Sequence, residues 1–370
     1  MIEVLTDPQI FVGQNAGGIS RLFTELYRQF ESDVNDVDMT VSGFWFGDNL
    51  YANACGMPQW KLLTNRNFRG KTRLQKSIAK IQTVYALKNR RVDIFHPTYY
   101  DPYFIPHLEK RPFVLTVHDM IHELYAEEFF PEDRITSRNK LLLAEQATRI
   151  IAVSQATKRD LSQLFKIDES RIDVVYHGAS VRPQQTSSFR PREARTEILY
   201  VGQRGAYKNF EVLVRATGLI AAKIPTVHVR CIGGGAFSEA ERSLFRSFEL
   251  SGRFSQEFVS EDELYQAYRR AGVFVFPSRC EGFGIPLLEA FSCGCPVIAS
   301  DIPVFREVAG DAAVYFDPSL HERLAELLLK ILSDKDFAGQ LTLNGYQQSA
   351  HFSWERCATE TAEVYRKALA

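Results

Sequence analysis

Two glutamates, Glu281 and Glu289, stand in a segment whose glycines are typical of a ligand-binding loop. The segment reads Pro-Ser-Arg-Cys-Glu-Gly-Phe-Gly-Ile-Pro-Leu-Leu-Glu-Ala from 277 to 290, with seven residues between the two acids. It follows an apolar run ending at Phe276 and opens a helical pattern. We therefore expect its loop at the carboxyl edge of a parallel sheet, where open α/β folds bind ligands. Both carboxylates can then accept hydrogen bonds from hydroxyl groups of one extended ligand.

A second loop of the same kind carries two cations, Arg204 and Lys208. Its residues read Tyr-Val-Gly-Gln-Arg-Gly-Ala-Tyr-Lys-Asn from 200 to 209, again directly after an apolar run. A planar guanidinium and a compact ammonium suit a diphosphate, whose charge they would neutralise as it leaves. An Arg and a Lys at this spacing are often only a solvated surface. Their position after a strand, in the same half of the chain as the two glutamates, favours the diphosphate interpretation.

Two loops in the first half could also contribute to a site. Gly17 and Gly18 join the first expected strand to a helix, where unpaired backbone N–H groups let a phosphate approach closely. A plain tight turn is the alternative, because the G-x-G-x-x-G spacing and the P-loop Lys are lacking. His118 and Asp119 end another strand pattern. The imidazole can position a substrate and handle a proton, whereas Asp119 can bind an acceptor, orient the imidazole or cap the following helix.

The elements that would position these loops are short apolar runs alternating with amphipathic helical segments, which is the pattern of a parallel α/β sheet. Strands are expected at 2–5, 39–44, 94–96, 113–117, 150–153 and 173–175, and then at 198–201, 227–232, 254–258, 273–276, 297–299 and 313–316. A polar, Pro-rich stretch at 182–196 between the two series is typical of an interdomain linker. We therefore predict two Rossmann-like domains, at 1–182 and 197–353, and a last helix at 354–370 that packs back on the first domain.

The composition is that of a folded protein large enough for two hydrophobic cores. The chain has 370 residues, of which 45% are hydrophobic and 24% charged, and a formal net charge of −1. Chains of this length usually divide into two domains. The near-zero charge gives no reason to expect a nucleic-acid partner, which normally needs a basic surface. The cysteines are scattered, which favours a reduced compartment, and the close pair Cys293 and Cys295 is interpreted as small residues packing at a helix end.

One segment departs from this charge balance. The stretch Lys61–Arg91 holds ten basic residues and no acidic one, and an apolar stripe of Leu74, Ile78, Ile81 and Tyr85 recurs in it at helical spacing. The pattern predicts an amphipathic helix with a basic flank. That flank would attract anionic lipid headgroups or a phosphorylated acceptor. The alternative is a helix packed on the core through the stripe, with a solvated charged face.

No metal ion and no cofactor is expected. Asp36 and Asp38 fit the Asp-x-Asp string of metal-dependent sugar transferases, but they precede an early strand, at the edge opposite to the ligands, and are interpreted as a turn. The N-terminus lacks the basic start and apolar run of a signal peptide, and no stretch reaches the roughly 18 uncharged apolar residues of a spanning helix. We expect a cytoplasmic protein, or one that is peripheral on the cytosolic face of the membrane.

The two charged loops and the Gly17-Gly18 loop together resemble the GT-B glycosyltransferases of family 4, which include bacterial mannosyltransferases and relatives of sucrose and glycogen synthases. The resemblance spans nearly the whole chain, with the segments in the expected order. It implies a GT-B fold, in which two Rossmann-like domains face each other across a cleft. It also implies a nucleotide diphospho-sugar bound mainly by the C-terminal domain, an acceptor bound by the N-terminal domain, and retention of configuration at the anomeric carbon.

The resemblance also implies roles for single residues in binding the donor. Glu281 would bond hydroxyls of the donor sugar, Glu289 those of the ribose, and Arg204 and Lys208 would hold the diphosphate. The remaining expected donor contacts are the backbone of Phe283, Gly284 and Ile285, the loop at Gly17 and Gly18, and the stretches 233–235 and 259–264 that line the nucleotide pocket, with Gly234, Val259 and Leu264.

The resemblance implies the catalytic set as well. His118 would face the donor sugar near the reacting centre, and together with Glu281, Arg204 and Lys208 it forms the expected catalytic set, while Asp119 is assigned to the acceptor. The first half shows no obvious carboxylate nucleophile for a double displacement, so we expect front-face transfer, with the departing phosphate taking the proton of the acceptor hydroxyl. The two domains are expected to close over the ligand.

The sugar donor and the competing functions are the last expectations. The His118-Asp119 pair, the Tyr-Lys-Asn end of the cation loop and the Tyr-His-Gly turn at 176–178 resemble mannosyltransferases and related O-antigen enzymes. GDP-mannose or another GDP-sugar is therefore expected ahead of a UDP-sugar, with a lipid-linked saccharide of a surface polysaccharide as acceptor. A dinucleotide-dependent oxidoreductase is disfavoured by the missing G-x-G-x-x-G. A non-catalytic nucleotide-binding scaffold is disfavoured by the intact charged residues of the two loops.

Overall fold

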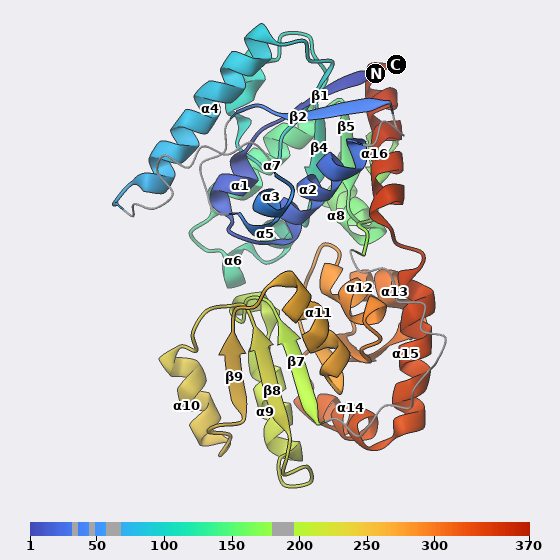
Figure 1. The fold of residues 1–370 in the computed structure, drawn as a ribbon. Helices are drawn as coiled ribbons and strands as arrows, with labels where there is room; N and C mark the ends of the chain where they lie inside the picture. The colour runs from blue at the N-terminus through green and yellow to red at the C-terminus, as the bar shows by residue number, and fades with distance from the viewer. Residues whose placement is uncertain (32–35, 44–48, 57–67, 180–195) are drawn as a thin grey trace. The chain divides into compact units, whose positions relative to one another are not determined.

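The computed structural model describes residues 1–31, 36–43, 49–56, 68–179 and 196–370. The chain forms two compact units: Met1–His177 with Trp354–Ala370, and Gly178–Ser353 (Figure 1). Both are α/β. The expected linker at 182–196 lies, except for its last residue, outside the described residues, as do positions 61–67 of the basic segment.

The first unit is built on parallel strands. Three of them pair in the order β2-β1-β3 and three in the order β4-β5-β6, and a parallel bridge between Phe95 and Phe113 joins the two groups. The strands are β1 (Ile2–Thr6), β2 (Val37–Val41), β3 (Ile94–His96), β4 (Val114–Val117), β5 (Arg149–Ala152) and β6 (Ile172–Val174). Every residue of β3 and β4 is buried, because helices cover a parallel sheet on both faces.

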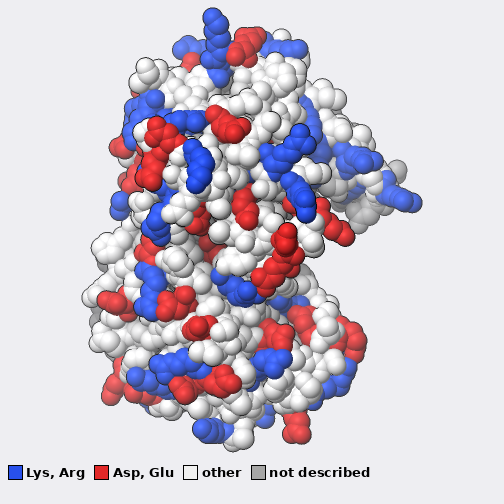
Figure 2. Space-filling model, turned by 180° about the vertical axis from the view of Figure 1, so that it is seen from behind, with Lys and Arg blue, Asp and Glu red and all other residues white. Residues whose placement is uncertain are grey.

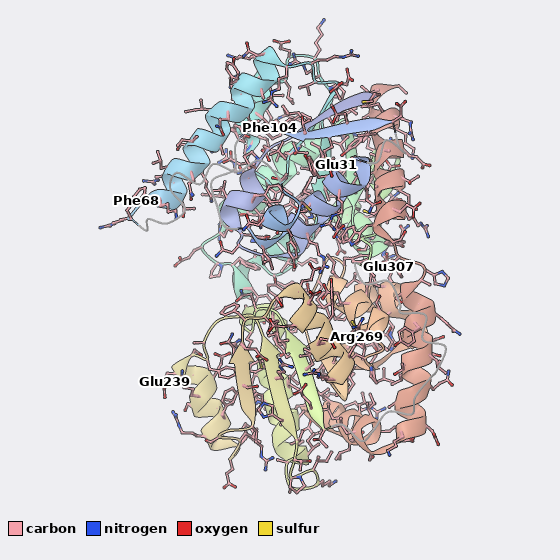
Figure 3. All side chains as sticks on the ribbon, viewed as in Figure 1. Glu31, Phe68, Phe104, Glu239, Arg269 and Glu307 are labelled. Carbon is pink, nitrogen blue, oxygen red and sulfur yellow. The ribbon has the colours of Figure 1, made fainter. Side chains whose placement is uncertain are left out.

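Helices surround these strands and cover a hydrophobic core. They are α1 (Gln9–Gly13), α2 (Gly18–Phe30), α3 (Leu50–Ala54), α4 (Lys71–Asn89), η2 (Pro102–His107), α5 (Ile121–Leu124), α6 (Ala126–Phe129), α7 (Arg134–Gln146), α8 (Gln155–Phe165), η3 (Glu169–Arg171) and α16 (Trp354–Leu369). Phe104 of η2 is fully buried in this core (Figure 3). The last helix, α16, packs on α2 and belongs to this unit, although almost the whole second unit separates it in sequence.

The second unit has one parallel sheet of six strands in the order β12-β11-β10-β7-β8-β9. The strands are β7 (Glu197–Val201), β8 (His228–Ile232), β9 (Phe254–Glu257), β10 (Val273–Phe276), β11 (Val297–Ser300) and β12 (Ala313–Phe316). From β7 the chain adds strands on one side, and it then crosses over to β10 and adds strands on the other. The direction of winding therefore reverses between β7 and β10, and the carboxyl ends of strands at such a point are where open sheets bind ligands.

The connections of this second sheet are helical. They are η4 (Ala206–Lys208), α9 (Phe210–Ile220), α10 (Glu239–Ser247), α11 (Glu261–Arg270), α12 (Ile285–Ser292), α13 (Pro303–Ala309), η5 (Gly310–Ala312), α14 (His321–Ser333) and α15 (Lys335–Ser349). Capping boxes begin α10 and α11, in which Ser238 pairs with Glu241 and Ser260 with Glu263. These reciprocal bonds satisfy N–H groups that a helix start leaves unpaired.

The expected strands are confirmed, with boundaries that differ from the expected ones by no more than a few residues. The second strand starts earlier than expected, at Val37, so that Asp36 precedes it with a φ of 57° while Asp38 already lies inside it. The interpretation of Asp36 and Asp38 as a turn therefore holds only for Asp36. A period-2 apolar pattern locates a strand well but not its first residue, since the ladder hydrogen bonds decide where it begins.

The orientation of α4 corrects one expectation. The apolar stripe does not pack on the core, because the exposed fractions of Leu74, Ile81 and Tyr85 are 44%, 68% and 67%. The buried face lies one residue further along the helix, at Gln75, Ala79, Thr83, Ala86 and Leu87. Small side chains on that face allow close approach, and the Thr83 hydroxyl lies 2.7 Å from that of Ser42.

This orientation predicts different effects for a negative charge on the two faces of α4. Ala86 is 1% exposed, so Ala86→Asp is expected to lower the free energy of unfolding by about 3–5 kcal/mol, the cost of an unpaired buried charge. Ile81→Asp on the outer face is expected to change it by less than about 0.5 kcal/mol. Urea unfolding of both variants checks this. A larger loss for Ile81→Asp than for Ala86→Asp would show that the stripe faces the core.

Candidate active site

The second unit brings together the loops that follow β7 and β10, its two central neighbouring strands. The Arg279 backbone N–H donates to the Tyr207 carbonyl at 2.8 Å. The Asn209 side-chain amide donates to the carbonyls of Pro277 and Pro318 at 3.1 and 2.8 Å. The loop with the predicted cations is thus fastened to the loop with the predicted acids, at the edge where the sheet changes direction.

Lys208 and Glu281 form an ion pair in this fastened region. The Lys208 Nζ lies 2.6 Å from Glu281 Oε1, and the side chains are only 19% and 13% exposed. Burial acts to lower the pKa of Lys208, but the Glu281 carboxylate outweighs it and holds that pKa above its usual value. The ammonium therefore stays charged at neutral pH. A diphosphate entering here would exchange one anionic partner of Lys208 for another.

Arg204 forms bonds of a different kind from those of Lys208. Its side chain is 4% exposed, and its Nε donates to Glu241 Oε1 at 2.6 Å. Its terminal nitrogens donate to the carbonyls of Gly233, Gly235 and Ala236 at 3.0, 2.7 and 3.2 Å. Four bonds use most of the five N–H donors of a guanidinium. Arg204 therefore holds the turn after β8 and does not point freely towards a ligand.

The turn after β8 requires glycine at position 234. Gly234 has a φ of +73°, and a Cβ there would lie 2.6 Å from a terminal nitrogen of Arg204 and 2.8 Å from the Gly202 carbonyl. Both the positive φ and the close approach exclude a side chain. Glu241, which completes this arrangement, was not predicted to be a site residue. Its only signal in the sequence was the Ser-x-x-Glu capping box of α10.

Glu289 lies on the inner face of α12 and is 4% exposed. Tyr268 of α11, which the sequence did not indicate, donates its hydroxyl to Glu289 Oε2 at 3.0 Å. Gly284 precedes α12 with a φ of +103°, where a Cβ would lie 3.1 Å from the Phe305 ring. The buried Phe283 and Ile285 flank it. Glycine at 284 is therefore required by the backbone, which turns sharply between the two predicted acids.

The other predicted contacts of the second unit are more peripheral. Val259 lies in the loop between β9 and α11, and Leu264 lies on α11, and both are half-buried. The structure thus groups Lys208 with Glu281 and fastens Arg204 to the turn at Gly234, while Glu289 has its own partner, Tyr268.

The predicted residues of the first unit surround a buried histidine. His118 directly follows β4 and is 8% exposed, and neither ring nitrogen has a hydrogen-bond partner within the described ranges. Burial lowers the pKa of His118 well below its usual value, and the nearby His177, His96 and Lys140 lower it further. The imidazole is therefore neutral at pH 7. Two unpaired buried nitrogens cost free energy, so they are suited to bonding a ligand.

Asp119 and the glycine loop each precede a helix of this unit. Asp119 Oδ1 accepts from the Ile121 N–H, the first of α5, at 3.1 Å, and Lys140 Nζ donates to the Asp119 carbonyl at 2.9 Å. Gly18 is the first residue of α2, and Gly17 precedes it with an extended φ of 172°. Phe23 of the same helix stands edge-on to His118, with ring centroids 6.4 Å apart. Of the three roles considered for Asp119, its contacts match the helix cap.

Comparison with known proteins identifies the family. The family model for glycosyl transferases group 1 matches residues 181–348, and the model for Glycosyltransferase Family 4 matches residues 16–182. The chain belongs to glycosyltransferase family 4. The predicted family and the predicted enzyme class, a glycosyltransferase, are thereby confirmed.

This family 4 glycosyltransferase has both sequence and structural relatives. It is 29% identical over 300 residues to the O-antigen chain mannosyltransferase B of Escherichia coli, covering 76% of each chain. It is 28% identical over 307 residues to a D-inositol 3-phosphate glycosyltransferase of Thermobispora bispora, covering 75% of this chain and 71% of that one. A sucrose-phosphate synthase from Thermosynechococcus elongatus matches its structure with a TM-score of 0.77 at 21% identity, covering 99% of this chain and 98% of that one. The structural likeness confirms the GT-B fold class.

The described residues of this glycosyltransferase contain neither a cluster of metal ligands nor a helix that could span a membrane. No group of three or more His, Cys, Asp or Glu side chains in them is placed to hold a metal ion. Nor is any helix in that part of the chain both long and apolar enough to cross a membrane.

The buried histidines of this glycosyltransferase predict a pH-dependent stability. Burial lowers the pKa values of His96 and His177 to about 3, and that of His118 also lies far below 6.5. Below pH 6.5 the unfolded chain binds protons that the folded chain does not, so stability falls with acidification by about 1.4 kcal/mol per pH unit for each such histidine. His118→Gln is expected to remove one of these contributions.

The measurement is urea unfolding of the wild type and His118→Gln between pH 7.5 and 5. Their difference in unfolding free energy is expected to be constant above pH 7 and to shift in favour of the variant below pH 6.5. Parallel curves over the whole range would mean that His118 titrates normally in the folded protein.

Proposed function

We propose that this enzyme is a retaining hexosyltransferase that moves mannose from GDP-mannose to a saccharide acceptor, which is lipid-linked and belongs to a surface polysaccharide such as an O-antigen. The observation that carries the proposal is the half-buried Lys208–Glu281 pair at the point where the second sheet changes direction. The similarity to an O-antigen chain mannosyltransferase supports the choice of sugar and pathway.

The charged pair suits two parts of a nucleotide sugar, the diphosphate and the sugar. Lys208 would bind the diphosphate and stabilise its growing charge, and Glu281, freed from Lys208, would accept hydrogen bonds from the sugar hydroxyls. Glu289, held by Tyr268, would accept those of the ribose. Arg204 would act indirectly, because its four internal bonds fix the turn at Gly233–Gly235 that borders the same edge. This replaces the expected direct contact of Arg204 with the diphosphate.

The proposed reaction is a front-face transfer without a metal ion. The bond between the anomeric carbon and the phosphate oxygen breaks, and the acceptor oxygen bonds to the same face of that carbon. The departing phosphate takes the proton of the acceptor hydroxyl. His118, which is neutral, would bond a sugar hydroxyl in the ground and transition states and would not supply a proton.

A membrane contact through α4 forms part of the proposal. Its outer face exposes Leu74, Ile81 and Tyr85, and Phe68 stands out just before its first turn (Figure 3). Basic side chains lie on the same helix, at the upper right of Figure 2. An exposed apolar stripe flanked by cations fits an anionic lipid surface. A lipid-linked acceptor would be found at such a surface, and the proposal therefore includes work on the cytosolic face of the membrane.

The catalytic proposal predicts a large loss of activity in Lys208→Ala. We expect kcat/KM for GDP-mannose to fall by about 10²- to 10³-fold, as for other preorganised groups that stabilise developing charge. Lys223→Ala, which removes an exposed lysine after α9, is the matched control and should leave kcat/KM unchanged. Equal activity of the two variants would remove Lys208 from the site.

The choice of donor predicts a selective thermal shift. GDP is expected to raise the melting temperature more than UDP, ADP or TDP at equal concentration, because a ligand that binds only the folded state stabilises it. NMR of the first product formed from GDP-mannose then tests retention. A larger shift with UDP would replace the donor by a UDP-sugar, and no shift with any nucleotide would contradict the proposed function.

The membrane proposal predicts binding to vesicles that contain an anionic phospholipid. Ile81→Glu with Tyr85→Glu is expected to weaken binding at least tenfold, since it removes apolar surface and adds negative charge. Leu219→Glu, at a residue of the second unit that is 49% exposed, is the control. Cosedimentation measures all three proteins. Equal loss in the control would mean that net charge, and not α4, governs binding.

A further inference from the structure

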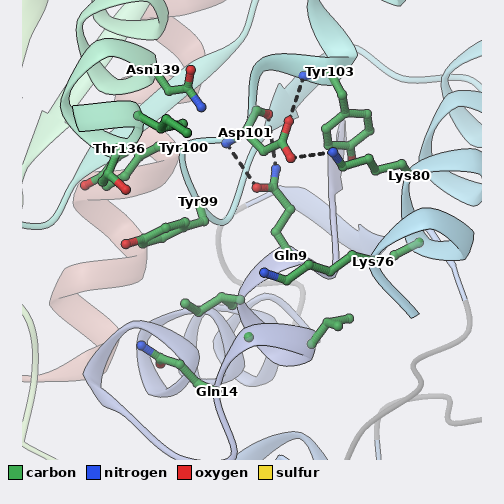
Figure 4. A pocket seen from close by; sticks show the side chains of 15 residues that line it. Gln9, Gln14, Lys76, Lys80, Tyr99, Tyr100, Asp101, Tyr103, Thr136 and Asn139 are labelled. Carbon is green, nitrogen blue, oxygen red and sulfur yellow. Dashed lines mark hydrogen bonds and ion pairs between the residues drawn. The ribbon is translucent and has the colours of Figure 1, made fainter. Parts of the chain in front are cut away.

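A cavity in the first unit lies outside the charged loops described above. Its volume is about 390 Å³, within the range of small-molecule sites. Residues from α1, α4 and α7 and from the segment between β3 and η2 line it (Figure 4). Its walls combine tyrosine rings, among them Tyr99, with amides and with two lysines, Lys76 and Lys80.

One wall of the cavity is fixed by a partly buried hydrogen-bond network. Gln9 Oε1 accepts from the Asp101 N–H at 3.1 Å, and the Asp101 carboxylate pairs with Lys80 at 2.5 Å. Asp7, fully buried, accepts from the Gln9 amide and, at 3.0 Å, from the Tyr103 hydroxyl. Because these side chains hold one another, the wall is already in place before a ligand arrives.

Other side chains of the lining have polar groups that are available to bond a ligand. No hydrogen bond or ion pair to a described residue engages the Lys76 ammonium or the Asn139 amide. Gln14 Oε1 is buried and has no hydrogen-bond partner in the described part of the chain. A buried acceptor without a partner costs free energy that a ligand hydroxyl can recover. The cavity thus offers an acceptor, an amide and an unneutralised cation together.

Tyr100 connects this cavity to His118. It lines the cavity, its hydroxyl accepts from the His118 backbone N–H at 2.9 Å, and its ring centroid lies 6.1 Å from that of His118. The His118 imidazole has both nitrogens unpaired among the described residues. Tyr100 would therefore link a ligand in the cavity to the histidine that the proposed function brings to the donor sugar.

We propose that this cavity binds the terminal sugar of the acceptor, with a phosphate group of that acceptor on Lys76. The Tyr99 ring covers the apolar face of the sugar, and the amides of Asn139 and Gln14 bond its hydroxyls. Lys80 is already neutralised by Asp101, so Lys76 is the cation that takes the phosphate. The assignment rests on the proposed function, because only a transferase needs a second sugar here.

The arrangement of α4 supports a phosphate attached to a lipid. Lys76, Ala79 and Lys80 face the cavity, whereas Ile81 and Tyr85 are exposed on the outer face. One helix thereby borders both the sugar and the proposed lipid surface. The phosphate that joins a sugar to its lipid carrier would lie between the two, at the level of Lys76.

The test measures binding of two probes, mannose 1-phosphate and mannose, to the full chain by calorimetry without nucleotide. Wild type is expected to bind mannose 1-phosphate more tightly than mannose. Lys76→Ala is expected to weaken mannose 1-phosphate about tenfold, the loss of one charge-assisted bond, and to leave mannose unchanged. Asn139→Ala weakens both probes. Lys88→Ala, on the same helix but outside the cavity, weakens neither.

Three outcomes would overturn the inference. They are no binding of either probe, binding unaffected by Asn139→Ala, and equal losses in Lys76→Ala and Lys88→Ala, which would indicate general surface charge. Hydrolysis of GDP-mannose by the same variants separates this inference from the proposed function. If hydrolysis by wild type is seen and the probes do not bind, only the cavity assignment fails. If the probes bind as expected and no nucleotide sugar is hydrolysed, only the proposed donor chemistry fails.

Discussion

The adjacency of β7 and β10 is the constraint on which the site of the second unit depends. It brings a cation and an anion, 73 residues apart in sequence, into one bond between Lys208 and Glu281. Removing two charges from water is costly, and their attraction offsets that cost only when the geometry is good. The proposed donor would replace this attraction, because it supplies both an anion for the lysine and hydroxyl donors for the glutamate. A glycosyltransferase donor has both.

The two cations of the same loop have different roles because their side chains differ. The guanidinium of Arg204 is a rigid fork with several donors, so it can hold three carbonyls and the Glu241 carboxylate at once. The ammonium of Lys208 is a compact charge on a flexible stem, which can exchange one partner for another. Among the bonds described, Arg204 shapes the edge of the site and Lys208 remains the group suited to meet a phosphate.

The candidate site residues of the first unit include buried histidines that carry no charge. His96 bonds Tyr365 and Thr116 at 2.7 and 2.8 Å, so the C-terminal helix is fastened to the sheet beside His118. Desolvation keeps these imidazoles neutral. A neutral histidine can donate one hydrogen bond and accept another, which suits it to positioning sugar hydroxyls more than to acid catalysis. The same unit holds the cavity lined by Tyr100 and the exposed outer face of α4, to which the proposals assign the acceptor and a lipid surface.

The sequence by itself determined the strands, their alternation with helices and the order of the loops, because apolar periodicity and the Gly-rich turns are local properties. It also located Lys208, Glu281 and His118 at the ends of strands, since parallel sheets bind ligands there. Only the tertiary structure decided that Arg204 bonds Glu241, that Tyr268 holds Glu289, and that α4 buries Ala79 instead of Ile81. The direction of a long side chain and the buried face of a helix depend on which residues approach from elsewhere in the chain. Tertiary packing decides which residues these are, and a local sequence pattern does not contain that information.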